Sequence, residues 1–251
     1  MHDKLLNENL MQHRRPEEAI ILAGGLGTRL RSISGDLLPK PMMPVAGRPF
    51  LAYLLDQLQT AGVRRTVLAV GHRHEAVITH FGAVYGEMSL EYSREDAPLG
   101  TGGALAKALA ATSAENLILL NGDSYYDIDI SHVFAYHLAV QADITIALKQ
   151  LDDCSRYGSI AIQDDRITAF HEKGRTGSGL INCGIYAVNR RILGHLAQHP
   201  PFSFESDVLS HTVSQLVIRP YVGEGYFIDI GIPEDYQRAQ HEFAGRTGAA
   251  C

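Results

Sequence analysis

A short apolar run near the start of the chain, followed at once by glycines, limits the fold more than any other feature. Residues 19–23 read Ala-Ile-Ile-Leu-Ala, and Gly24, Gly25 and Gly27 come next. Five apolar residues that end in a turn signal are typical of a parallel strand buried on both faces. Glycines after such a strand let several backbone N–H groups approach an anion, because no Cβ stands in the way. The sequence therefore predicts a sheet with a phosphate-binding loop at one edge.

The following hundred residues alternate between helical and strand patterns. Helices are predicted at residues 50–61, 74–81 and 102–111, and strands at residues 66–70, 88–92 and 116–120. This order requires a parallel sheet with crossover helices, and such sheets bind ligands beyond the carboxyl ends of their strands. Later segments predict antiparallel additions and further helices; these are strands at 144–148, 159–162, 167–170 and 216–221, a turn at 164–165, and helices at 205–212 and 233–243.

Composition narrows the classes of partner. The net charge of the 251 residues is -6, which argues against non-specific nucleic-acid binding. No apolar run approaches the roughly 20 residues that span a bilayer, so no membrane partner is expected. Three cysteines without zinc-ligand spacing favour reduced thiols in a cytoplasmic protein. We expect a flexible extension at residues 1–17, one domain at 18–245 and a short tail at 246–251.

Two familiar phosphate-binding motifs do not fit the glycine loop. A P-loop continues with Lys and then Ser or Thr, whereas Thr28-Arg29 stands here. A dinucleotide-binding loop needs another glycine three residues after Gly27 and an acidic residue at the end of the next strand. Neither is present, so these two classes are disfavoured. A tight turn without any ligand stays open at this point.

Two cations follow the loop. Lys40 lies between Pro39 and Pro41, which fix the backbone on both sides and lower the entropy lost when the ammonium binds an anion. Arg29 offers a planar fork for bidentate phosphate contacts. A solvated surface position is the alternative for each of them.

Taken together, residues 22–30 and 39–42 resemble the signature of the sugar-1-phosphate nucleotidyltransferases. Further matching segments follow in order over residues 19–243; they are 99–105, 121–123, 172–173, 182–186 and 227–231. The resemblance implies a single-domain, three-layer, Rossmann-like α/β fold of the glycosyltransferase-A type, with a mostly parallel sheet and antiparallel additions. Segments 95–104, 121–129 and 226–236 look most like family members that transfer GMP from GTP to a heptose 1-phosphate.

The resemblance also implies a role for each matched residue. Catalytic roles fall to Arg29, Lys40, Asp123 and Asp229, and the last two would bind Mg²⁺. Nucleotide-binding positions are Leu22, Ala23, Gly24, Gly25, Gly27, Thr28, Gly100, Thr101 and Gly102, where the small residues of the second turn would leave room for a purine. Sugar-phosphate-binding positions are Gly122, Glu172, Lys173, Asn182 and Gly184.

The reaction that this likeness implies joins a nucleoside monophosphate from an NTP to a sugar 1-phosphate and releases pyrophosphate, for synthesis of a surface polysaccharide or glycoconjugate. A phosphate nucleophile is already anionic, so catalysis should depend on positioning and charge neutralisation. Another NTP, a hexose, mannose or N-acetylmuramate 1-phosphate, and a non-catalytic nucleotide-sugar-binding regulator stay open as alternatives. A homo-oligomer is equally open. His72, His74 and His80 form no zinc pattern, and we expect them to be solvated.

Overall fold

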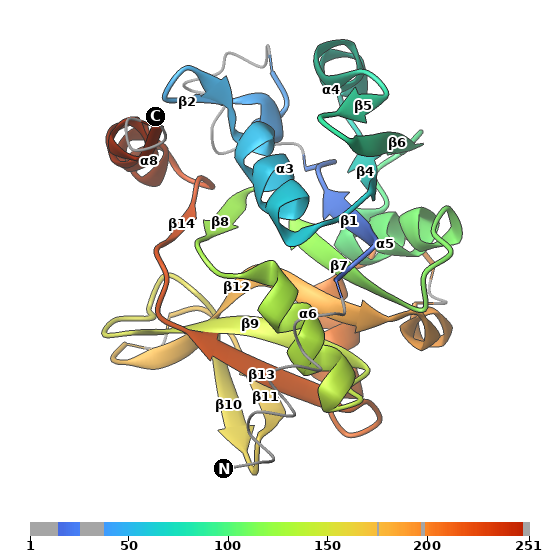
Figure 1. The fold of residues 1–251 in the computed structure, drawn as a ribbon. Coiled ribbons are helices and arrows are strands. Elements are labelled where there is room, and N and C mark those ends of the chain that lie inside the picture. The colour runs from blue at the N-terminus through green and yellow to red at the C-terminus, as the bar shows by residue number, and fades with distance from the viewer. Residues whose placement is uncertain (1–14, 26–37, 175, 197–198, 248–251) are drawn as a thin grey trace, which may run out of the picture.

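The structure, a computed structural model, describes residues 15–25, 38–174, 176–196 and 199–247 (Figure 1). A mixed sheet runs through the middle. Within the described residues its strands are β1 (Glu18–Leu22), β4 (Arg65–Val70), β5 (Val84–Tyr85), β6 (Met88–Arg94), β7 (Asn116–Asn121), β9 (Ile144–Leu151), β10 (Ser159–Gln163), β11 (Arg166–His171), β12 (Gly179–Asn189) and β13 (Ile218–Gly223). Two short ladders join β2 (Pro44–Val45) to β3 (Arg48–Pro49) and β8 (Ser124–Tyr126) to β14 (Phe227–Asp229).

The centre of the sheet is parallel, as predicted. Strand β1 pairs with β7 on one side and with β4 on the other, and β6 pairs with β4 beyond it. On the far side of β7 the sheet turns antiparallel, because β12 pairs with β7 and β9 pairs with β12 in that sense. The predicted α/β fold with antiparallel additions is confirmed.

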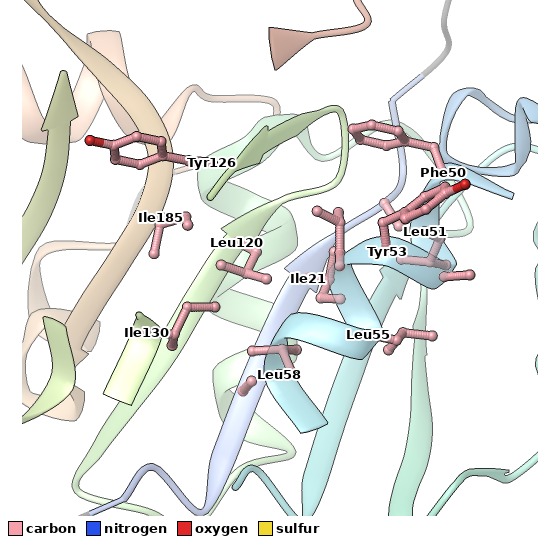
Figure 2. Close-up of a cluster of buried hydrophobic side chains, with 14 of the residues drawn as sticks. Ile21, Phe50, Leu51, Tyr53, Leu55, Leu58, Leu120, Tyr126, Ile130 and Ile185 are labelled. Atoms are coloured by element: carbon pink, nitrogen blue, oxygen red, sulfur yellow. The ribbon is translucent and has the colours of Figure 1, made fainter. Parts of the chain in front are cut away.

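Side chains alternate across the sheet into two hydrophobic cores. Ile21 and Leu120 belong to one core, and Ile20 and Leu119 belong to the other. The first core is covered by α3 (Phe50–Ala61), α4 (His74–Phe81), α6 (Ile130–Ala139) and α8 (Pro233–Thr247). Figure 2 shows this packing, with Leu55 and Leu58 of α3 over the sheet. The second core lies under α5 (Gly100–Ala110), η3 (Arg190–His195) and η4 (Phe204–Leu209). A sheet between two helical layers is therefore present.

Strand β12 and helix α6 are among the elements that went unrecognised in the sequence. Strand β12 contains a register shift between Asn182 and Tyr186, and Gly184 there has a φ of 75°. This bulge breaks the period-two pattern that would have marked a strand. Helix α6 carries a capping signal that was overlooked, since the Asp129 carboxylate accepts hydrogen bonds from the backbone N–H groups of Ser131 and His132.

Several predicted boundaries also move. Pro16 is buried and the carbonyl of Glu17 accepts hydrogen bonds from the N–H groups of Arg64 and Arg65, so residues 15–17 pack on the domain. At the other end α8 continues past residue 245 to Thr247. The helix predicted at 205–212 is a π-helical segment, η4, followed by one α-helical turn, α7 (Ser210–Thr212). Among the described residues no helix is long and apolar enough to cross a bilayer.

Candidate active site

A cleft of about 1460 Å³ opens at the carboxyl edge of the parallel strands. A backbone hydrogen bond joins the ends of β7 and β1 at this edge, since the N–H of Gly122 donates to the carbonyl of Leu22 at 3.0 Å. Most of the predicted site residues line this cleft; they are Leu22, Gly24, Gly25, Lys40, Gly100, Thr101, Gly122, Asp123, Glu172, Lys173, Asn182, Gly184 and Asp229. Ala23 is instead buried in the core. Gly27, Thr28 and Arg29 lie outside the described residues.

Asp123 and Asp229 are brought together by the short β8–β14 ladder. Asp123 directly precedes β8, and Asp229 ends β14 in register with Ser124. The backbone N–H of Ile230 donates to the carbonyl of Asp123 at 2.9 Å, which closes the ladder. Two aspartates far apart in the sequence thus meet at one point of the cleft.

Lys40 joins these two carboxylates. Its ammonium donates to Oδ2 of Asp123 at 2.6 Å and lies 3.8 Å from Oδ1 of Asp229. The Lys40 side chain is only 12% exposed, and a single 3₁₀ turn with the buried Pro41 holds its backbone. The alternative that Lys40 is a solvated surface cation is therefore wrong. Gly231 leaves the space for this approach, because a Cβ there would lie 3.2 Å from the ammonium.

The electrostatic environment of Asp229 favours a bound cation. Burial raises the pKa of its carboxyl group, and the neighbouring charge of Asp123 raises that pKa further. The ammonium of Lys40, the N–H of Gly231 and the charge of Lys173 act in the opposite direction. Two carboxylates in one partly desolvated place repel each other, so positive charge at this point stabilises both.

The donor set suits a hard divalent cation. One oxygen of each aspartate faces the same ammonium, so both carboxylates converge on one position. Mg²⁺ usually takes one or two protein carboxylates and fills its shell with water and substrate phosphates. Among the described residues no group of three or more His, Cys, Asp or Glu side chains is placed to hold a metal. The two-carboxylate arrangement therefore fits Mg²⁺ bound together with its substrate.

Comparison with known proteins places the chain in a family. A profile described as "Nucleotidyl transferase" matches residues 18–245. The chain belongs to the nucleotidyl transferase family. This nucleotidyl transferase is 44% identical over 225 residues to D-glycero-α-D-manno-heptose 1-phosphate guanylyltransferase of Aneurinibacillus thermoaerophilus, covering 90% of this chain and 97% of that relative. It is 40% identical to the enzyme of the same name in Campylobacter jejuni, covering 87% and 96%.

A solved structure is also similar to this chain in fold and sequence. HddC of Yersinia pseudotuberculosis, crystallised in a complex with GMP-PN, matches with a TM-score of 0.79 and 38% identity. The match covers 90% of this chain and 99% of that one. Members of this family generally use a divalent metal, in keeping with the paired aspartates of this nucleotidyl transferase.

The turn at the start of α5 differs from the expectation in one respect. A Cβ at Gly102 would lie 2.2 Å from the ring of Phe202, and a Cβ at Gly100 would lie 2.3 Å from the carbonyl oxygen of Phe202. Phe202 therefore fills the space beside these glycines, so protein packing by itself already requires their small size. Gly100 and Thr101 still line the cleft, whereas Gly102 does not.

Glu95 and Glu205 are among the carboxylates in the cleft walls that sequence reasoning did not assign to the site. Glu95 follows β6, and its Oε2 accepts a hydrogen bond from the N–H of Leu99 at 3.0 Å. It stands in the segment 95–104 that carried the family likeness, so a signal was available. Glu205 lies on η4 and is hydrogen-bonded to β12. No sequence signal marked it, because it looked like one more acidic residue of a predicted surface helix.

Proposed function

We propose that this chain transfers GMP from GTP to D-glycero-α-D-manno-heptose 1-phosphate, giving the GDP-sugar and pyrophosphate. The observation that carries the proposal is the meeting of Lys40, Asp123 and Asp229 in the cleft that Gly24 and Gly25 also line, in a chain 44% and 40% identical to two enzymes of that name. We further propose that the reaction takes place in the cytoplasm, where Cys183, a buried thiol, would stay reduced.

The proposed reaction is an in-line displacement at the α-phosphorus of GTP. A phosphate oxygen of the sugar 1-phosphate forms the new O–P bond while the bond to the β-phosphate oxygen breaks and pyrophosphate leaves. The backbone N–H groups around Gly24 and Gly25, with the predicted contribution of Gly27, Thr28 and Arg29, would hold the β- and γ-phosphates. Lys40 would neutralise charge near the α-phosphate. Asp123 and Asp229 would hold Mg²⁺, which neutralises phosphate charge when bound.

The sugar 1-phosphate is proposed to bind on the opposite side of the cleft, near β11 and β12. Lys173 follows β11 and its charge acts on Asp229, so it lies close enough to the reaction centre to meet the phosphate of the sugar. Glu172 and the backbone at Gly122 and Gly184 complete the proposed sugar-phosphate subsite, and Asn182, which the family likeness also assigns to it, lines the same cleft.

We assign guanine recognition to Glu95. Its Oε1 lies over Gly24, 2.3 Å from the position that a Cβ there would occupy, so the carboxylate stands between the glycine loop and the turn at Gly100. The Watson–Crick edge of guanine presents two donors, N1–H and N2–H, which one carboxylate can accept together. Adenine presents an acceptor at N1, which a carboxylate repels. Glu95 would therefore favour GTP over ATP.

Replacing this carboxylate tests the base assignment. We expect Glu95→Gln to lower kcat/KM for GTP by about 10- to 50-fold and to narrow the preference for GTP over ATP, because a charge-assisted bidentate contact is lost. Glu87→Gln, an exposed residue outside the cleft walls, is the matched control and should leave both values unchanged. Pyrophosphate release with each NTP gives the measurement. An unchanged GTP preference in Glu95→Gln would assign base recognition to another residue.

The function itself is tested by a matrix of substrates. Purified protein with Mg²⁺ should release pyrophosphate fastest from GTP and D-glycero-α-D-manno-heptose 1-phosphate. Mannose 1-phosphate should have at least a tenfold lower kcat/KM, since it lacks one hydroxyl that the site would bind. Faster reaction with a hexose or N-acetylmuramate 1-phosphate would replace the heptose assignment. Binding of GTP without turnover on any sugar would favour a regulator.

A further inference from the structure

Glu205 is held in the cleft by an unusual set of donors from the sheet. Its Oε1 accepts hydrogen bonds from the hydroxyl of Tyr186 at 2.7 Å and from Nδ2 of Asn182 at 3.0 Å. Nδ2 of Asn121 approaches the same oxygen at 3.4 Å. Tyr186 is fully buried in the second core, between the ring of Phe204 and the sheet. Oε1 of Glu205, a carboxylate in the cleft wall, is thus held by a hydrogen bond from a tyrosine of the hydrophobic core.

The other oxygen of Glu205 is available to a ligand. Glu205 is exposed and forms part of the cleft wall on η4. Among the described residues none donates a hydrogen bond to Oε2. A carboxylate that is ionised accepts hydrogen bonds and cannot donate them, so its free oxygen suits a ligand with hydroxyl or N–H donors.

Tyr186 is suited to fix the orientation of this carboxylate. Burial raises the pKa of the Tyr186 hydroxyl well above its usual value, and the charge of Glu205 raises it further. The Tyr186 hydroxyl therefore stays protonated and donates a hydrogen bond to Glu205. A buried hydroxyl must find a partner or incur a desolvation cost, so this bond fixes the orientation of the Glu205 side chain.

Asn182 is occupied by the protein. Both hydrogens of its amide are used, since Nδ2 donates to the hydroxyl of Tyr186 at 2.7 Å as well as to Glu205. Its Oδ1 accepts the backbone N–H of Gly184 at 3.0 Å. Asn182 therefore has little hydrogen-bonding capacity left for a sugar hydroxyl. Its own hydrogen bonds hold Glu205 and the β12 bulge in place. The carboxylate is the stronger candidate for the contact that the family likeness gave to Asn182.

The position of Glu205 favours the sugar over the base. The donors that hold it come from β7 and β12, and β12 pairs with β10, which in turn pairs with β11. Strand β11 ends at His171, immediately before Glu172 and Lys173. Glu205, on η4, is thus hydrogen-bonded to β12, the strand that connects through β10 to the proposed sugar-phosphate residues. Glu95, by contrast, stands over Gly24.

We infer that Glu205 binds hydroxyl groups of the sugar 1-phosphate and helps to select that sugar, and that Tyr186 is its positioning residue. This inference rests on the proposed function in one respect only, that the acceptor is a sugar 1-phosphate. It adds a specificity determinant whose support lies outside the cleft, in the second hydrophobic core.

Steady-state kinetics of two variants test the inference. Glu205→Gln keeps the shape of the side chain and removes its charge, and we expect it to raise KM for the sugar 1-phosphate about 10- to 30-fold with KM for GTP changed less than twofold. Tyr186→Phe removes only the buried hydroxyl and should raise KM for the sugar about 3- to 10-fold. Both variants should also narrow the discrimination between heptose 1-phosphate and mannose 1-phosphate.

Tyr126→Phe is the matched control for Tyr186→Phe. Tyr126 is equally buried, and its hydroxyl donates to the backbone carbonyl of Leu148 at 3.2 Å, away from the cleft walls. Tyr126→Phe should lower the Tm by about as much as Tyr186→Phe does. It should leave KM for GTP and KM for the sugar unchanged. A shift of KM for the sugar in Tyr186→Phe and not in Tyr126→Phe separates positioning from a general loss of stability.

The outcomes are distinct from those that decide the function. The kinetics use whichever sugar 1-phosphate the wild type turns over fastest, so a preference for another sugar would overturn the heptose assignment and leave Glu205 testable. Equal rises of KM for GTP and for the sugar in Glu205→Gln, or wild-type kinetics in that variant, would overturn the inference. If the wild type turns over no sugar, calorimetric titration of the same variants with heptose 1-phosphate decides it, and unchanged or absent binding overturns it.

Discussion

Asp123→Asn and Asp229→Asn should each lower kcat by about 1000-fold, because each removes one of the two carboxylates that converge on the proposed Mg²⁺. An amide is a weaker ligand for a hard cation than a carboxylate, so the Mg²⁺ concentration for half-maximal activity should rise in both variants. Pyrophosphate release over a Mg²⁺ titration measures both effects, with circular dichroism to show that the fold persists.

Both aspartate variants should lower kcat and raise the Mg²⁺ requirement, so agreement between them tests the shared metal site. Asp152→Asn, an exposed carboxylate on the loop after β9 and outside the cleft walls, should leave kcat and the Mg²⁺ requirement unchanged. Asp229 also accepts a hydrogen bond from the N–H of Gly231 at 2.6 Å, so a purely structural role as a turn cap is the competing reading. Full turnover in Asp229→Asn with a lowered Tm would support that reading and remove Asp229 from the metal site.

The parallel half of the fold could be predicted from the sequence because its signals are local. The run of residues 19–23, the helix Phe50–Ala61 and the strand that ends before Asp123 each carry an apolar period and a boundary signal within a dozen residues. The edge of the sheet where ligands bind followed from that topology. The positions of Gly24, Lys40 and Asp123 in one cleft are a direct consequence.

The antiparallel half of the sheet was predicted less completely. Its strand pairing depends on contacts between segments that are far apart in the sequence. The bulge at Gly184 interrupts the alternation of β12, and only the pairing with β7 and β9 shows that the segment is one strand. Glu205 illustrates the same difficulty for the site. Its role depends on Tyr186 and Asn182 from another element, and nothing near Glu205 in the sequence points to them.

Lys40 should prove as important as the aspartates but for a different reason. We expect Lys40→Met to lower kcat by about 100-fold, because its ammonium would offset charge that develops around the α-phosphate and the leaving pyrophosphate. Removal of the ammonium takes away the positive charge that lies 2.6 Å from the Asp123 carboxylate and 3.8 Å from that of Asp229. The Mg²⁺ concentration for half-maximal activity should therefore stay the same or fall, the opposite of the change in the aspartate variants.

Two further variants refine this prediction. Lys40→Arg should also be impaired, since the Lys40 side chain is only 12% exposed and a guanidinium group is larger than the ammonium that it would replace. Lys107→Met, a lysine outside the cleft walls, should have wild-type kinetics. Recovery of full kcat in Lys40→Met at high Mg²⁺ would mean that Lys40 only arranges the two aspartates. A persistent loss of kcat at saturating Mg²⁺ would instead place its charge in the transition state.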